Sequence, residues 1–185
     1  ILAKLLADNP QKNLTEEQVR YAETIQSAGN DLLVLINDIL DLAKIEAGHM
    51  EVHPEPVPIA DLFDGLRRAF EPLAAQKGLQ IQSWISPACP QTIETDRQRL
   101  EQVLKNLMSN AVKFTEQGEV TLGVDLAPDG RIAFAVTDTG IGIPEHQQQV
   151  VFEAFRQADG TTNRKYGGTG LGLSISRELA RLLGG

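Results

Sequence analysis

A long amphipathic segment near the start of the chain places the strongest limit on the fold. Residues 16–47 carry apolar side chains at three- and four-residue steps, and Gly48 follows as a stop signal. Thr15 and Gln18 form a capping-box pattern at its start. A helix of this length extends for ~45 Å, which is more than one small neighbour can cover. The stripe therefore predicts a helical hairpin or an intermolecular bundle, with packing along the chain's own domain as the alternative.

The segments around this helix predict a second, mixed domain. Residues 1–9 read as the end of a preceding helix, and the three alternating prolines of residues 53–58 predict a stiff, extended linker and a domain boundary. A helix over residues 59–77 follows, with four apolar side chains facing inward: Leu62, Leu66, Phe70 and Leu73. Strands are expected at residues 79–86, 92–95, 119–126 and 131–137, the last two joined as a hairpin by a Pro-Asp-Gly turn.

The helix expected over residues 100–115 carries a polar edge beside its apolar stripe. Asp96 is suited to be its N-cap. At the helical repeat, Asn106, Asn110 and Lys113 fall within an arc of roughly 60°. Amide oxygens are hard, neutral ligands that suit Mg²⁺, and a nearby ammonium can neutralise phosphate. The alternative is an ordinary amphipathic helix whose polar edge faces water.

Two glycine-rich stretches follow this helix. Asp138 ends a strand-like run, and Gly140 and Gly142 let a flat ring approach, so the carboxylate could accept a hydrogen bond from the adenine amine. The alternative is that Asp138 caps a tight turn. Pro144 then predicts the first turn of a helix that contains three apolar residues: Val150, Val151 and Phe155.

The second stretch, residues 167–173, runs directly into a helical pattern. Glycines in front of a helix expose backbone N–H groups that suit phosphate. Two common phosphate loops are excluded, because Leu173 stands where a P-loop needs lysine and where a dinucleotide-binding loop needs its last glycine.

Four stretches in order resemble the ATP-binding domain of sensor histidine kinases. Residues 106–115 resemble the N box of that family, residues 138–144 its G1 box, residues 152–155 its F box, and residues 168–172 its second glycine box. The wider superfamily includes the type II topoisomerase ATPase, the Hsp90 chaperone and the MutL mismatch-repair protein. The sequence of residues 157–170 is similar to that of hybrid kinases, which also carry receiver domains.

The resemblance implies an α+β fold. It consists of a Bergerat-type α/β sandwich, with a mixed sheet and helices on one face, preceded by the long helix of a hairpin. Residues 1–52 would be the C-terminal part of the dimerisation and phosphoacceptor hairpin, residues 53–58 the linker, and residues 59–185 the C-terminally truncated catalytic domain. Residues 156–167 would form a mobile lid, in which the cation that meets the γ-phosphate is left open.

The resemblance also implies roles for individual residues. Mg²⁺ would be held by Asn110 and Asn106, which with Lys113 would form the catalytic set, and adenine would be recognised by Asp138. The residues expected to bind ATP are Asn110, Lys113, Asp138, Gly140, Gly142, Arg164, Lys165, Gly168, Thr169, Gly170, Leu171 and Gly172.

The phosphoacceptor itself is not expected within this chain. Residues 33–48 resemble the second hairpin helix, whereas the first should carry a histidine followed by Glu or Asp. The only histidines are His49, His53 and His146, none with that context, and solvated or structural roles are expected for them. The chain is thus expected to begin just after the phosphoacceptor and to bind Mg²⁺-ATP without phosphorylating itself.

Composition restricts the possible partners. A net charge of −8 argues against nucleic-acid binding, and no run approaches the ~18 apolar residues of a membrane span. The expected partners are a second copy, through the hairpin of the full protein, and a receiver domain or response regulator. A cytoplasmic location is expected, with membrane attachment of the full protein left open. Two other functions remain: an ATP hydrolase, for which Glu101 is the nearest general-base candidate, and a catalytically silent scaffold.

Overall fold

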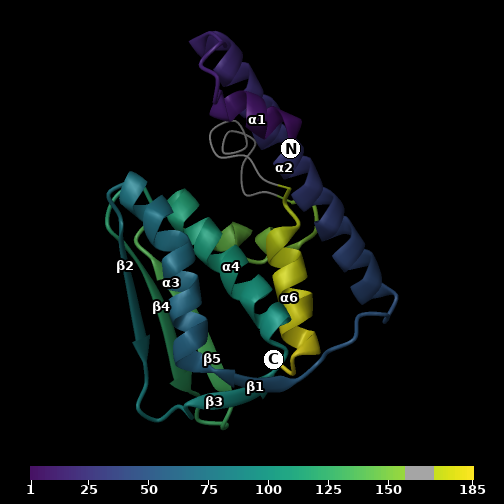
Figure 1. Ribbon diagram of the computed structural model, residues 1–185. Coiled ribbons are helices and arrows are strands. Elements are labelled where there is room, and N and C mark those ends of the chain that lie inside the picture. The colour runs from purple at the N-terminus through teal and green to yellow at the C-terminus, as the bar shows by residue number, and fades with distance from the viewer. Residues whose placement is uncertain (157–168) are drawn as a thin grey trace.

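The computed structural model describes residues 1–156 and 169–185. Helices lie on one face of a twisted sheet, and a long helix crosses beside them (Figure 1). The α-helices are α1 (Leu2–Asp8), α2 (Glu16–Glu46), α3 (Ile59–Gln76), α4 (Arg97–Phe114) and α6 (Gly172–Leu182). The strands are β1 (Glu55–Pro58), β2 (Gln80–Ile85), β3 (Thr92–Thr95), β4 (Glu119–Leu126) and β5 (Ile132–Asp138).

The main sheet is mixed, as the sequence predicts. Its strand order is β2-β4-β5, with β2 parallel and β5 antiparallel to the central strand. Leu122 of β4 pairs with Ser83 on one side and Val136 on the other. The inward residues of β4 are buried against α3 and α4, which form the helical layer seen in Figure 1. This core fixes the position of α4, the helix with the polar edge.

The inward face of α3 is rotated slightly from the one expected. Leu62, Leu66 and Phe70 are buried, but Leu73 is 49% exposed, so its predicted inward position is wrong. Phe63 and Ala74 are buried instead. The helical repeat explains why the buried residues differ from those expected. The apolar face of α3 is wide enough to include Phe63, and at the last turn the small Ala74 faces the core in place of Leu73.

The proline-rich segment is extended, but part of it belongs to a strand. Glu55–Pro58 form β1, which pairs antiparallel with β3 in a separate two-stranded sheet. Val57 is fully buried in the core shared by α3, α4 and β4. Proline is compatible with such a strand because it adopts an extended backbone and is tolerated at a sheet edge. Residues 55–58 are therefore anchored to the structure that follows them.

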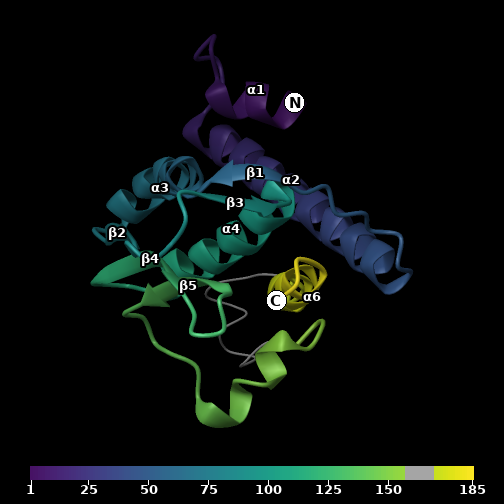
Figure 2. The same ribbon diagram turned by 90° about the horizontal axis from the view of Figure 1, so that it is seen from below.

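The stretch after Pro144 is not the α-helix expected there. It contains two short 3-10 turns, Glu145–Gln147 and Val150–Phe152, which lie apart from the helical layer in Figure 2. Phe155 has a left-handed backbone with φ of +62° and is 65% exposed. With little apolar burial to stabilise them, these few residues do not continue into a regular helix.

The long helix α2 has the predicted capping box, because Thr15 and Gln18 bond reciprocally. One side of α2 contacts α6, with which Leu35, Leu42 and Ile45 form an apolar cluster. Many of its other apolar side chains are exposed: Ile25, Leu32, Leu33, Ile36, Ile39 and Leu40. Much of the stripe is thus uncovered within one chain. No helix in residues 1–156 and 169–185 has the length and apolar character needed to cross a bilayer.

Candidate functional site

The start of α4 is held by one buried carboxylate. Asp96 accepts the backbone N–H of Arg99 at 3.0 Å, as a helix N-cap does, and that of His53 at 3.0 Å. Burial by itself would raise the pKa of Asp96, but these hydrogen bonds outweigh it and lower the pKa below its usual value. The N-cap predicted from the sequence is confirmed, and it also anchors the segment that precedes β1.

The polar edge of α4 faces the start of α6. Asn106 donates from Nδ2 to Ser176 Oγ at 2.8 Å, and its Oδ1 lies against Gly172. A Cβ atom at Gly172 would sit 2.3 Å from that oxygen, so a side chain at this position would require Asn106 to move. Asn110, one turn later, is half-buried, and its side chain makes no hydrogen bond to the described residues. The two asparagines therefore differ: one braces α6, and the amide of the other is available.

Lys113 follows Asn110 on the same edge. It is half-buried, and this burial lowers the pKa of its ammonium. Its Nζ lies 4.9 Å from the centroid of the Phe114 ring. An ammonium that has already lost part of its hydration is a good partner for a phosphate, because less water must be removed when the anion arrives.

The first glycine loop begins where β5 ends. Asp138 is the last residue of that strand, and its Oδ1 accepts the N–H of Gly140 at 2.8 Å. A Cβ atom at Gly140 would lie 2.5 Å from the carbonyl oxygen of Phe114, so the loop rests directly on the end of α4. Gly142 has a left-handed backbone, with φ of +68°. Asp138 does cap this turn, yet its Oδ2 makes no hydrogen bond to the described residues.

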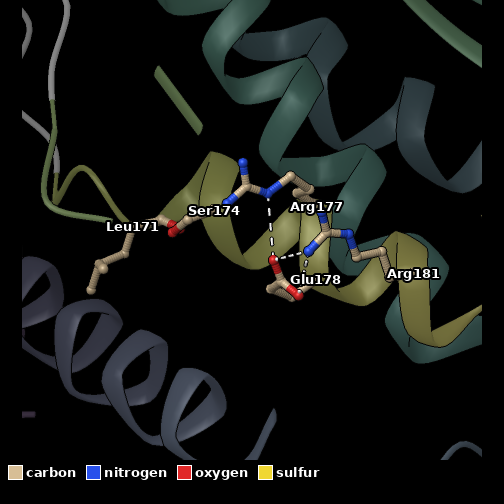
Figure 3. A network of polar contacts seen from close by, with 5 residues as sticks. All are labelled: Leu171, Ser174, Arg177, Glu178 and Arg181. Carbon is tan, nitrogen blue, oxygen red and sulfur yellow. Dashed lines mark hydrogen bonds and ion pairs between the residues drawn. The ribbon is translucent and has the colours of Figure 1, made fainter. Parts of the chain in front are cut away.

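The second glycine stretch leads into α6. Thr169 donates from Oγ1 to Asp38 Oδ2 of α2 at 3.1 Å and accepts the N–H of Leu171 at 3.2 Å. Gly170 has φ of +71°, and its carbonyl accepts the N–H of Phe155 at 3.1 Å. Leu171 is fully buried, and its side chain extends toward the neighbouring α2 (Figure 3). This stretch therefore contacts both the long helix and the region of the F box.

The exposed side of α6 carries a small ionic network. Arg181 contacts Glu178 at 2.9 Å and Arg177 contacts the same carboxylate at 3.4 Å, as Figure 3 shows. Arg177 also lies 5.9 Å from the ring centroid of Phe152. This contact joins α6 to the 3-10 turn that precedes the undescribed stretch.

Two family models match the chain, and their order agrees with this arrangement. Residues 95–185 match the histidine kinase-, DNA gyrase B- and HSP90-like ATPase family, and residues 1–48 match the His kinase A phospho-acceptor domain. The first match contains α4 and both glycine stretches, and the second contains α2. The chain belongs to the sensor histidine kinases.

Known relatives of this sensor histidine kinase chain are larger proteins. It is 39% identical over 176 residues to the signal transduction histidine-protein kinase BarA of Escherichia coli K12, covering 93% of the chain and 19% of BarA. It is 36% identical over 187 residues to the autoinducer 2 sensor kinase/phosphatase LuxQ of Vibrio cholerae, covering all of the chain and 22% of LuxQ. The chain thus spans about a fifth of these relatives.

A solved structure shares the arrangement. The crystal structure of full-length ShkA in complex with AMPPNP superimposes with a TM-score of 0.81 at 37% sequence identity, and it covers 99% of this chain and 37% of ShkA. The α/β sandwich and the long helix expected from the sequence are thereby confirmed for this kinase chain.

The structure brings most of the predicted site residues of this kinase together. The asparagine edge meets Gly172, and the loop with Asp138 rests on the end of α4. Arg164, Lys165 and Gly168, and most of the expected lid, lie outside the described residues. Sequence reasoning missed three contacts around the site. Ser176 accepts from Asn106, Thr139 accepts from the N–H of Glu119, and Lys77 donates to the carbonyl of Lys113. No local pattern reveals them, because each joins segments that are distant in the chain.

The residue considered for a hydrolase is engaged elsewhere. Glu101 contacts Lys105 at 2.6 Å and Arg97 at 3.0 Å on the surface of α4. The hydrogen bond from Lys105, with that from Arg97, holds the pKa of Glu101 below its usual value. A general base needs a pKa near the working pH, so these contacts make Glu101 a poor base.

Proposed function

We propose that this chain binds Mg²⁺-ATP and is the catalytic region that transfers the γ-phosphate to a histidine outside the chain. The observation that carries the proposal is the direct contact of three segments. Gly172 is packed on Asn106 of α4, and Gly140 is packed on the last turn of the same helix. These two close contacts join α4 to both glycine stretches, and they support a preformed nucleotide site. The AMPPNP complex of the similar kinase ShkA supports this assignment.

The residues can be given roles in that site. Asp138 would accept the adenine amine with Oδ2, since Oδ1 already holds the Gly140 turn. Gly140 and Gly142 would let the base approach. Lys113 would face phosphate, and the glycine stretch at the start of α6 would contribute backbone N–H groups. The residues proposed for this stretch and the adjoining lid are Arg164, Lys165, Gly168, Thr169, Gly170, Leu171 and Gly172.

The donor set also fits Mg²⁺. The half-buried amide of Asn110 makes no hydrogen bond to the described residues, and its oxygen is the hard, neutral ligand that Mg²⁺ accepts beside phosphate and water. We assign Asn110 as the principal ligand. Asn106 remains the second candidate through Oδ1, although its Nδ2 is bonded to Ser176. Bound Mg²⁺ would neutralise phosphate charge, and phosphoryl transfer depends chiefly on such neutralisation and on positioning.

Partners of the whole protein follow from the long helix and from the relatives. The exposed apolar side chains of α2 suit a second copy in a helical bundle, so we propose a homodimer through the hairpin. A receiver domain is the proposed phosphoryl acceptor after histidine, because hybrid signal transduction histidine kinases of Dictyostelium discoideum are among the relatives. A cytoplasmic setting for this region completes the proposal.

A calorimetric titration of ATP into the chain, with and without Mg²⁺, tests the function. We expect Mg²⁺-dependent binding that Asp138→Asn weakens by at least roughly tenfold, because the single oxygen of the amide cannot serve in place of Oδ1 for the Gly140 N–H and of Oδ2 for the adenine amine. Asp129→Asn, in the exposed hairpin turn, is the matched control and should bind normally. Absence of binding by the unchanged chain would overturn the nucleotide site and favour a silent scaffold.

A second assay separates transfer from hydrolysis. Incubation with γ-labelled ATP should leave no stable label on the chain, because no histidine occurs among residues 1–48. Retained label would contradict the proposal that the acceptor lies outside this chain. Steady phosphate release that Glu101→Gln abolishes would instead support the hydrolase.

A further inference from the structure

The C-terminal end of α4 is closed by two other segments. The last four carbonyl groups of a helix have no partner within it, so they must bond elsewhere. Here the carbonyls of Val112 and Lys113 accept from Lys77 Nζ at 2.8 and 2.9 Å. The carbonyl of Thr115 accepts from the same Nζ at 3.4 Å. The carbonyl of Phe114 accepts from the N–H of Ile141 at 3.4 Å.

Lys77 therefore bridges the ends of two helices. It is the C-cap of α3, and its N–H bonds to the carbonyl of Ala74, which fixes its backbone. Its ammonium stands at the C-terminal end of α4, where a cation is favoured by the helix dipole. One flexible side chain thus contacts three carbonyl groups at the end of a single helix, which would otherwise bond only to water.

The same helix end supports the first glycine loop. Gly140 rests on the carbonyl of Phe114, the one carbonyl in this group that Lys77 does not contact. Beside it, Thr139 Oγ1 accepts the N–H of Glu119 at 3.0 Å and donates to the carbonyl of Gln117 at 3.2 Å. The loop that carries Asp138 is consequently held by the last turn of α4 and by the turn that follows it.

We propose that Lys77 is a positioning residue of the nucleotide site, acting through the last turn of α4 on Lys113 and on the Gly140–Gly142 loop. The inference rests on the proposed function. Lys77 bonds the carbonyl of Lys113 itself, so it fixes the backbone from which that ammonium projects. Without Lys77, three carbonyl groups would hydrogen-bond only to solvent, and the last turn of α4 would fray. The Phe114 carbonyl would then no longer be a fixed support for the loop.

Binding measurements on the whole chain test this inference. Lys77→Met keeps most of the aliphatic stem but removes every donor, and it should weaken Mg²⁺-AMPPNP binding roughly tenfold, as outer-layer partners of binding sites do. Lys77→Arg keeps a cationic donor and should recover most of the affinity. Lys105→Met is the matched control, because Lys105 also lies on α4 but, among the described residues, its ammonium contacts the Glu101 carboxylate and no carbonyl at the helix end. It should bind like the unchanged chain.

Hydrogen exchange without nucleotide separates the inference from the function. In Lys77→Met the amide of Ile141 should exchange faster, while the central strand β4 keeps its protection. If Lys77→Met fails to fold, Lys77→Gln, whose amide keeps two N–H donors, can be compared with the unchanged chain in the same way. Unchanged Ile141 exchange or unchanged affinity in a folded variant would overturn the role of Lys77. Failure of the unchanged chain to bind AMPPNP would overturn the proposed function instead, and the exchange result would then still show whether Lys77 holds the loop.

Discussion

The two asparagines of α4 illustrate how neighbouring residues of one type divide their tasks. The side chain of Asn106 bonds Ser176, whereas the side chain of Asn110 has no hydrogen bond to the described residues. We predict that Asn110→Ala removes the Mg²⁺ dependence of nucleotide affinity and changes the free energy of unfolding by less than about 0.5 kcal/mol. Asn106→Ala should cost about 1 kcal/mol of stability through the lost hydrogen bond. Calorimetry and urea unfolding of both variants check this, and normal Mg²⁺ dependence in Asn110→Ala would contradict it.

Substituting alanine at two different glycines should change the free energy of unfolding in opposite directions. In Gly172→Ala the new methyl would meet Asn106 Oδ1, so Asn106 must swing away from Ser176. We predict a loss of about 1–3 kcal/mol of stability together with weaker nucleotide binding. In the control, Gly65→Ala on exposed α3, the methyl meets nothing within 4 Å, and stability should rise by about 0.5–1 kcal/mol. Equal unfolding midpoints for the two variants would show that the close contact is unimportant.

At the scale of elements, the start of α4 depends on one carboxylate. Asp96→Ala removes an N-cap and the bond to His53, and we predict a loss of about 1–2 kcal/mol at pH 7. The pKa of Asp96 is lower in the folded chain than its usual 3.8. Its contribution is therefore complete above that value and is lost as the pH falls through the folded pKa. Unfolding at pH 7 and pH 3 checks this, because the gap between variant and unchanged chain should narrow in acid.

Local signals in the sequence account for most elements and for the order of the site. Caps at Thr15 and Asp96, and the turn between β4 and β5, act through neighbours along the chain, so they could be read directly. The predictions that failed concern residues whose structure depends on how much of the side chain is buried. Leu73 lies at the rim of an apolar face, and the residues after Pro144 have too little packing to form a helix.

The contacts that complete the site could not be predicted because they join distant segments. Lys77 meets α4 from 36 residues away, Ser176 meets Asn106 from 70, and Thr169 meets Asp38 from 131. Each involves a common polar residue with no pattern of its own. Only the packing of the core brings these partners together.

For the whole molecule, the main question is how the catalytic half rests on the long helix. An apolar cluster joins Leu171 and α6 to α2, and polar contacts flank it. Thr169 bonds Asp38, and Asp41 accepts from Gln102 at 2.7 Å with Arg99 at 3.7 Å. Burial raises the pKa of Asp38, so the ionised carboxylate is less stable in this arrangement than in water. The contact should therefore tighten as the pH falls through that raised pKa.

One pair of substitutions on α2 tests this contact without changing the catalytic half. Leu42 packs in the cluster with Leu171, whereas its near neighbour Leu40 is 51% exposed. Leu42→Ala should weaken the contact by about 1–2 kcal/mol, since part of a buried side chain is lost. Leu40→Ala makes the same change in helix propensity and should leave the contact intact. Small-angle scattering, compared at equal molar mass, should show a larger radius of gyration for Leu42→Ala alone, most clearly at pH 7. Identical radii would mean that the catalytic half is held to α2 by the polar contacts instead, and Asp41→Ala would then have to release it.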